Sequence, residues 1–93
     1  MFKTNEYFGG QVMSMAFENE EGKATLGLMA PGEYEFGTST IEVMTVVSGE
    51  MSVLLPLESE WKTFKAYESF VVEKDTKFKL VIKADCAYKC IYK

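Results

Sequence analysis

The chain has 93 residues, a length that suits one domain with a modest hydrophobic core. Its ten basic residues are all lysine, and fourteen acidic residues give a net charge of −4. Because there is no histidine, serine–histidine and cysteine–histidine catalytic pairs and imidazole metal ligands are excluded. The acidic balance without arginine also argues against nucleic-acid binding.

Apolar and polar residues alternate with a period of two through most of the chain, which predicts half-buried β-strands. Residues 5–8, near the N-terminus, are expected to form one turn of helix or an extended arm. The expected strands are residues 11–18, 24–29, 32–36, 42–48, 50–55, 61–65, 69–72, 78–83 and 88–93. Short turns separate them. Eight or nine short strands in one domain spanning residues 1–93 predict an all-β fold, a small antiparallel jelly-roll barrel. Such a barrel has a mouth where a small ligand can bind.

The N-terminus lacks the long apolar run of a signal peptide, and the longest apolar stretches, such as residues 53–57, are too short to cross a membrane. The two cysteines, Cys86 and Cys90, fall on the same face of one strand, about 13 Å apart, which is too far for a disulfide. We therefore expect two buried free thiols and a cytoplasmic protein with no membrane partner.

The central segment, residues 31–51, resembles the first conserved motif of the cupins. Glu42 and Gly49 match the glutamate of that motif and the glycine seven residues after it. Two metal-binding histidines of the motif are replaced by Phe36 and Thr38. A second cupin-like segment, residues 67–80, has Phe78 where the last histidine would be. Phenylalanine cannot bind a metal, and one carboxylate with one hydroxyl is a poor ligand set, so we expect a cupin barrel without a metal.

A closer resemblance covers nearly the whole chain. It is carried by Asn5-Glu6-Tyr7-Phe8, Gly32-Glu33-Tyr34-x-Phe36-x-Thr38, Glu42-x-Met44-Thr45-Val46-x-Ser48-Gly49, Leu54-Leu55-Pro56, Trp61, Phe70-x-Val72 and Tyr88-x-Cys90-x-Tyr92. These residues look like the pyrimidine/purine nucleoside phosphorylases, small bacterial cupins that use no metal. The resemblance implies an enzyme without a cofactor, which cleaves purine and pyrimidine nucleosides with phosphate into free base and pentose 1-phosphate. It also implies a homodimer, which would cover the exposed edges of so small a barrel.

The candidate site residues follow from the cupin geometry and from the resemblance. Glu42 and Thr38 are the candidate catalytic residues. Glu42 would bind ribose hydroxyls or move a proton. The candidate substrate-binding residues are Tyr34, Phe36, Met44, Phe78, Tyr88, Tyr92 and Lys23. The aromatic rings would stack on the base, which suits a broad range of nucleosides. Lys23 is the expected phosphate contact, since a relative has arginine at that place and this chain has none to hold phosphate.

Each assignment has a structural alternative. Glu42 can be a buried acid that bonds to Thr38 or to water, and Phe36 and Phe78 can simply fill the core. For the whole protein, the alternatives to a phosphorylase are a cupin that binds a nucleoside or sugar without catalysis and a purely structural dimeric cupin.

Overall fold

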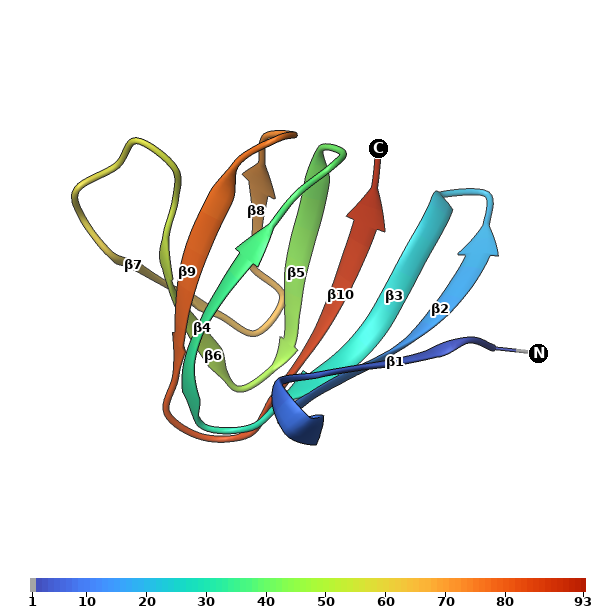
Figure 1. Ribbon diagram of the computed structural model, residues 1–93, viewed down its shortest axis with the longest axis horizontal. Coiled ribbons are helices and arrows are strands. Elements are labelled where there is room, and N and C mark those ends of the chain that lie inside the picture. The colour runs from blue at the N-terminus through green and yellow to red at the C-terminus, as the bar shows by residue number, and fades with distance from the viewer. Residues whose placement is uncertain (1) are drawn as a thin grey trace.

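The structure, a computed structural model, describes residues 2–93. These residues form two antiparallel β-sheets (Figure 1). The first sheet has the strand order β1 (Thr4–Tyr7), β2 (Val12–Asn19), β3 (Gly22–Met29), β10 (Cys86–Tyr92), β5 (Glu42–Ser48), β8 (Ser69–Val72). The second has the order β4 (Gly32–Gly37), β9 (Lys77–Ile82), β6 (Glu50–Leu54), β7 (Lys62–Lys65). The predicted all-β fold is confirmed.

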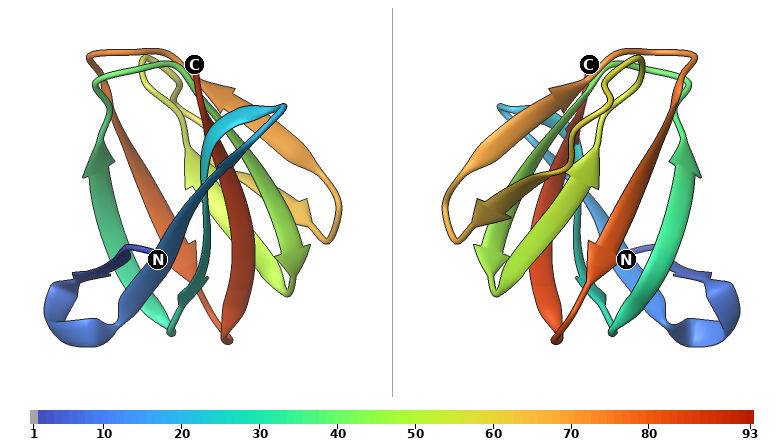
Figure 2. Two further views of the ribbon diagram at one scale, coloured as in Figure 1. Left: turned by 90° about the vertical axis from the view of Figure 1, so that its right-hand side faces the viewer. Right: turned by 90° about the vertical axis from the view of Figure 1, so that its left-hand side faces the viewer.

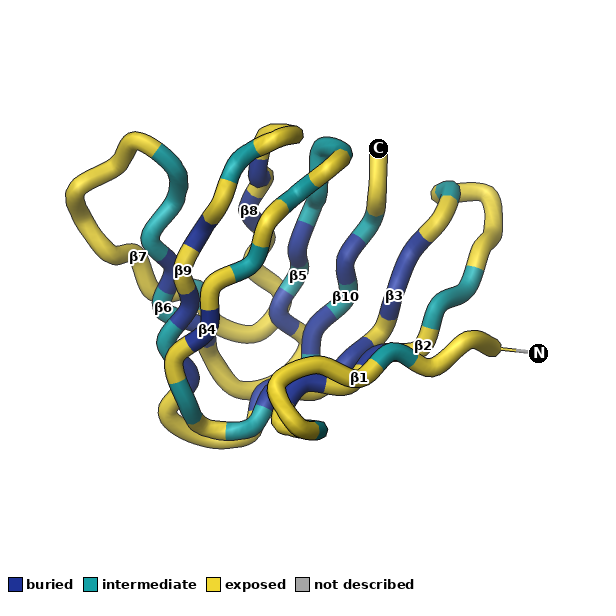
Figure 3. The backbone as a smooth tube through the Cα atoms, viewed as in Figure 1, coloured by how far each residue is buried: buried dark blue, intermediate teal, exposed yellow. Residues whose placement is uncertain are grey.

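The two sheets lie face to face, and the core fills the space between them (Figure 2). The alternation seen in the sequence is what builds this core, since every second residue of a strand points inward. Met44 and Val46 on β5, for example, are buried, whereas Val47 is exposed. Figure 3 shows the same alternation along β3, β5 and β10. The described residues include no helix of the length and apolar character needed to cross a membrane.

The N-terminal segment differs from the expected helical turn or arm. Residues 4–7 form strand β1, which pairs with β2 and places Tyr7 opposite Val12. A single 3₁₀ turn, η1 (Phe8–Gly10), then reverses the chain. Phe8, Gly9 and Gly10 have φ angles of 53°, 65° and 92°. Positive φ at three successive residues cannot continue a right-handed helix, so the segment becomes a hairpin.

The other predicted strands are found, with ends shifted by at most two residues. Strands β5 and β8 have the predicted bounds. The last strand begins at Cys86, two residues earlier than expected, because Cys86 is buried and pairs with Met29. Gly49, in the turn after β5, has a φ of 85°, and a Cβ there would lie 2.9 Å from the carbonyl oxygen of Asp85. This close approach explains why the turn requires glycine.

Candidate active site

A cavity of about 190 Å³ lies between the two sheets. Its walls are lined by Tyr7, Ser14, Met29, Phe36, Gly37, Glu42, Met44, Phe78, Tyr88, Cys90 and Tyr92. These residues come from β1, β2, β3 and β10 on one side, from β5 beside β10, and from β4 and β9 on the other side. The cavity therefore lies where the inward faces of both sheets meet, as the barrel architecture predicts.

Glu42 is the acidic side chain in this wall. It starts β5, shares its inward face with Met44 and lies opposite Tyr92 of β10. Its carboxylate is half-buried and accepts a hydrogen bond at Oε1 from the thiol of Cys90, with an Sγ–Oε1 distance of 3.5 Å. Burial raises the pKa of Glu42, and the hydrogen bond from Cys90 lowers it in part.

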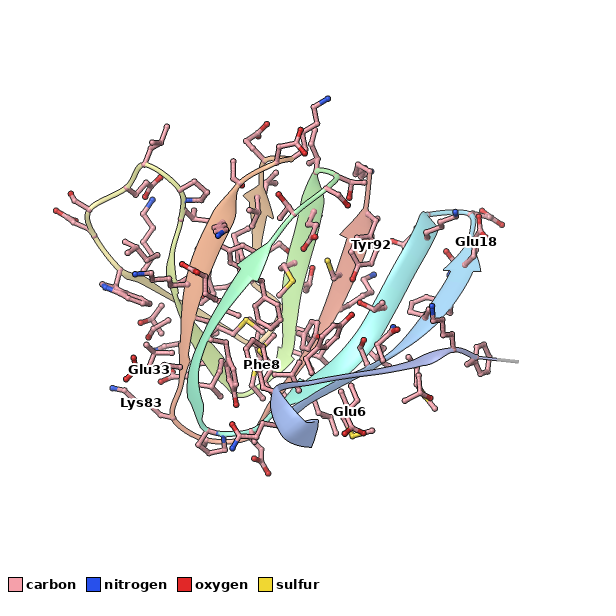
Figure 4. The ribbon with its side chains drawn as sticks, viewed as in Figure 1. Glu6, Phe8, Glu18, Glu33, Lys83 and Tyr92 are labelled. Atoms are coloured by element: carbon pink, nitrogen blue, oxygen red, sulfur yellow. The ribbon has the colours of Figure 1, made fainter. Side chains whose placement is uncertain are left out.

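Two tyrosines of β10 add hydroxyl groups to the cavity. Burial raises the pKa of Tyr88 to about 12, with a smaller contribution from nearby Cys90, while a hydrogen bond with Ser14 opposes the rise. Tyr92 lies near the C-terminal end of β10 (Figure 4), and its hydroxyl is 3.1 Å from Oγ1 of Thr25 on β3. Burial also raises the pKa of Tyr92. Both phenols therefore stay protonated near neutral pH and can donate hydrogen bonds.

Aromatic rings form the wall that faces Glu42. The rings of Phe36 on β4 and Phe78 on β9 are 6.0 Å apart between centroids. Tyr7 meets Phe36 edge to face at 6.3 Å, and Phe8 contacts both Phe36 and Tyr34, at 5.5 and 5.1 Å. The N-terminal hairpin thus closes one side of the cavity. A planar base suits such a wall because aromatic faces stack on any base.

A second, more open groove adjoins the cavity and shares Gly37, Glu42 and Tyr92 with it. Lys3 and Lys23 line this groove, and neither forms an ion pair with another described residue. Thr40 lines it as well, and its hydroxyl is buried with no hydrogen-bond partner within residues 2–93. The groove thus offers two ammonium groups next to Glu42.

Two of the predicted site residues, Thr38 and Tyr34, line neither the cavity nor the adjoining groove. The Thr38 hydroxyl lies 2.7 Å from the carbonyl oxygen of Glu73 and accepts a bond from the Thr76 amide at 3.1 Å. It ties the loop after β4 to the loop before β9. The Tyr34 hydroxyl donates to the carbonyl oxygen of Ala30 at 2.6 Å. Glu42 is bonded by Cys90 and not by Thr38.

The remaining predicted residues are brought together. Phe36, Glu42, Met44, Phe78, Tyr88 and Tyr92 line the cavity, and Lys23 lines the adjoining groove. Sequence reasoning did not assign Tyr7, Ser14, Met29, Thr25, Thr40, Lys3 or Cys90 to the site. For Cys90 a signal existed, since the alternation in the last strand gives it the same face as Tyr88 and Tyr92.

The residues present do not suit the metal that cupins commonly bind. Phe36 and Phe78 occupy two of the ligand positions and pack against each other, and the Thr38 hydroxyl bonds to backbone. Within residues 2–93, no three histidine, cysteine, aspartate or glutamate side chains come together. Glu42 alone is a poor ligand set for a transition metal.

The two facing sheets with a cavity between them have the arrangement of the cupin fold. The chain superposes on an RmlC-like cupin from Shewanella frigidimarina with a TM-score of 0.72, covering 96% of this chain and 80% of the other, at 18% identity. At that identity the likeness concerns the fold alone. The predicted cupin barrel is confirmed.

A sequence model of the pyrimidine/purine nucleoside phosphorylases matches residues 2–92. A protein of that name from Pseudomonas putida strain F1 is 56% identical over 93 residues, covering 100% of this chain and 99% of its own. Another from Alcanivorax borkumensis is 53% identical over 92 residues, covering 99% and 98%. The chain belongs to the pyrimidine/purine nucleoside phosphorylase family, as its sequence predicted.

Two solved structures share the fold and are similar in sequence. A protein of unknown function from Vibrio parahaemolyticus superposes with a TM-score of 0.94 at 44% identity, covering 100% of this chain and 99% of the other. A second protein of unknown function, from Acinetobacter, has a TM-score of 0.92 at 34% identity, covering 98% and 90%.

Proposed function

We propose that this protein is a phosphorylase of broad specificity, which cleaves purine and pyrimidine nucleosides with inorganic phosphate. The observation that carries the proposal is the position of Glu42. Its half-buried carboxylate lies at the junction between an aromatic cavity and a groove with two unpaired lysines. Phosphorolysis needs these three features side by side, for the sugar, the base and the phosphate.

The base packs against Phe36 and Phe78 in the cavity, and Met44 adapts to its size. No base-specific pocket is required, which suits both purines and pyrimidines. The ribose then lies at the junction, where the Glu42 carboxylate accepts hydrogen bonds from its hydroxyls and Tyr92 offers a further polar contact.

Phosphate attacks the anomeric carbon of the ribose from the groove side. The new bond joins a phosphate oxygen to C1′, and the C1′–N bond breaks with its electron pair going to the base. Hydrogen phosphate gives up its proton as the ester dianion forms, and the base gains one, so the reaction balances. Glu42 stabilises the positive charge that develops on the sugar ring. Tyr88, which stays protonated, donates a hydrogen bond to the departing base.

Lys23 holds the phosphate, with Lys3 beside it. Ammonium groups bind phosphate as point charges and lack the paired geometry of a guanidinium. The two lysines together supply the charge that a chain without arginine needs. Tyr34 and Thr38 support the site from outside the cavity, by fixing the strand and loop that carry Phe36 and Gly37.

The protein acts as a homodimer. The outer face of the first sheet carries an apolar patch made of Met13, Met15, Leu26, Leu28 and Val47, and we name it the outer apolar face. No charged residue lines the groove that runs over it. A second copy of the same flat face suits it best, because two sheets pack well face to face and a two-fold axis makes such a surface complementary to itself.

Cys86 and Cys90 are both free thiols, so we place the enzyme in the reducing cytoplasm.

The test is to incubate the purified protein with uridine or adenosine, with and without phosphate, and to separate free base and pentose 1-phosphate. Release of base that requires phosphate supports the proposal. Binding of the nucleoside without any release favours the alternative, a cupin that binds nucleosides without catalysis. Metal analysis of the same preparation should find less than one tenth of an equivalent of iron, manganese, nickel or zinc, roughly the level expected without a ligand set.

A further inference from the structure

Cys90 supplies the one hydrogen bond that the Glu42 carboxylate receives from the described residues. Cys90 is 1% exposed, and its Sγ lies 3.5 Å from Oε1 of Glu42. Cys90 pairs with Met44 across β5 and β10, and Tyr92 pairs with Glu42, so the thiol and the carboxylate are diagonal neighbours on one face. The bond engages one carboxylate oxygen and leaves Oε2 free.

We propose that Cys90 is a positioning residue of the active site: its thiol holds Oε1 of Glu42 and so presents Oε2 to the ribose. This inference rests on the proposed function, since it names the carboxylate oxygen that meets the substrate. Cys90 does not touch the reacting atoms. It fixes the rotamer of the side chain that does.

A thiol suits this task better than a stronger donor. Burial and the nearby Glu42 carboxylate raise the pKa of Cys90, so it remains a thiol and a donor at neutral pH. The S–H group is a weak donor, so it orients the carboxylate while leaving most of its negative charge for the substrate. A hydroxyl would hold the same oxygen but stabilise the charge more strongly.

Other charged or titratable groups surround Glu42, and they have other roles. They are Tyr88 and Tyr92 on β10, Tyr7 on β1, Glu18 on β2, Lys23 on β3 and Lys3 before β1. None of them donates a hydrogen bond to Glu42 in the structure, and the Tyr92 hydroxyl bonds with Thr25. Lys3 and Lys23 are exposed, so water screens their charge. Among the described residues, Cys90 is therefore the group that orients the Glu42 carboxylate by a hydrogen bond.

The experiment compares Cys90→Ala, Cys90→Val and Cys90→Ser with a matched control, Cys86→Ala. Alanine leaves a gap and valine fills it, and both remove the donor, whereas serine keeps one. Cys86 lies on the same strand, is equally buried and bonds to a backbone carbonyl outside the cavity. Two readouts are needed for each variant. The first is steady-state phosphorolysis of uridine. The second is the pKa of the Glu42 carboxyl group, followed through the ¹³C NMR chemical shift of its carboxyl carbon.

Losing the donor should lower kcat by about tenfold in both the alanine and the valine variant, with KM for uridine changing by less than about twofold. The Glu42 pKa should rise by about one unit in both, the size expected for one lost bond to a carboxylate. Serine should restore kcat to within about threefold of the original and bring the Glu42 pKa to or below its original value. The Cys86 control should leave both readouts unchanged even where it lowers Tm.

A Glu42 pKa that is the same in all Cys90 variants as in the original protein contradicts the positioning role. So does a serine variant as slow as the valine variant. Original protein that releases no base refutes the proposed phosphorylase instead, and the NMR titration then still decides whether Cys90 holds Glu42. Should the alanine variant fail to fold, the valine and serine pair gives the same comparison.

Discussion

Gly27 and Tyr88 lie directly opposite each other on β3 and β10, and the Tyr88 ring lies over the glycine Cα. A Cβ at residue 27 would lie 2.7 Å from Cε1 and Cζ of Tyr88 and 2.7 Å from the carbonyl oxygen of Met13. Backbone on one side and a buried ring on the other leave no room for a methyl group. Gly27 thus sets the position of the Tyr88 hydroxyl in the cavity.

Gly27→Ala should therefore destabilise the protein by about 1–3 kcal/mol, the usual cost of overpacking a core. It should also lower kcat, because the Tyr88 ring has to move away from the base. Gly37→Ala is the matched control, since its Cβ would meet nothing closer than 3.8 Å. Urea unfolding of both variants measures the difference. Equal free energies of unfolding for the Gly27→Ala and Gly37→Ala variants would show that the Tyr88 ring can move aside without strain.

The outer apolar face predicts the oligomeric state. Light scattering of the original protein should give twice the chain mass of 10.5 kDa at micromolar concentration. Leu28→Glu, in the middle of this face and 62% exposed in one chain, should give a monomer because two carboxylates would be buried in the interface. Leu57→Glu, a fully exposed control in the loop between β6 and β7, should remain dimeric. A monomeric original protein contradicts the assignment of this face.

Lys23 should affect phosphate binding and little else. Lys23→Ala should raise KM for phosphate by roughly tenfold, the effect of losing one charge-assisted contact, and leave KM for uridine within about twofold. Lys79→Ala, on the outer side of β9 and outside both the cavity and the adjoining groove, is the control and should change neither value. A larger change in the uridine KM than in the phosphate KM would place the anion elsewhere.

Glu42 should make stability depend on pH in a definite direction. Burial raises its pKa above the ordinary value of 4.5, so the folded state favours the protonated form. The contribution of Glu42 to the free energy of unfolding is therefore most favourable below pH 4.5, and it is lost as pH rises through the pKa of the folded state. Glu42→Gln removes the cost of burying a charged carboxylate at higher pH. The variant should have the higher Tm at pH 7, and the difference should shrink toward pH 4.5. A constant difference would mean that another effect sets it.

The sequence predicted the fold well because the alternation is strong. The strand pattern from Glu42 to Ser48 predicted the bounds of β5, and the cupin geometry predicted that Glu42 faces the interior. The N-terminal hairpin was missed because positive φ at Phe8 is stabilised by tertiary contacts with Tyr34 and Phe36, which local propensity does not contain.

The candidate site was predicted in part for a similar reason. Motif spacing predicted Thr38 beside Glu42, but β4 ends at Gly37, and Thr38 turns toward the carbonyl oxygen of Glu73. The cross-strand register that brings Cys90 to Glu42 depends on which strands become neighbours, and a single sequence does not state that.

The central claim is that Glu42 in this cavity carries phosphorolysis. The most direct measurement compares phosphate-dependent release of uracil from uridine by the original protein and by Glu42→Gln, with Tm recorded for both. The glutamine keeps the shape of the side chain and removes its charge. We expect kcat to fall by about a hundredfold while the fold is retained, because a charge that stabilises the transition state is lost. Unchanged turnover would contradict the account and make Glu42 a structural acid, since the higher Tm at pH 7 is expected in either case.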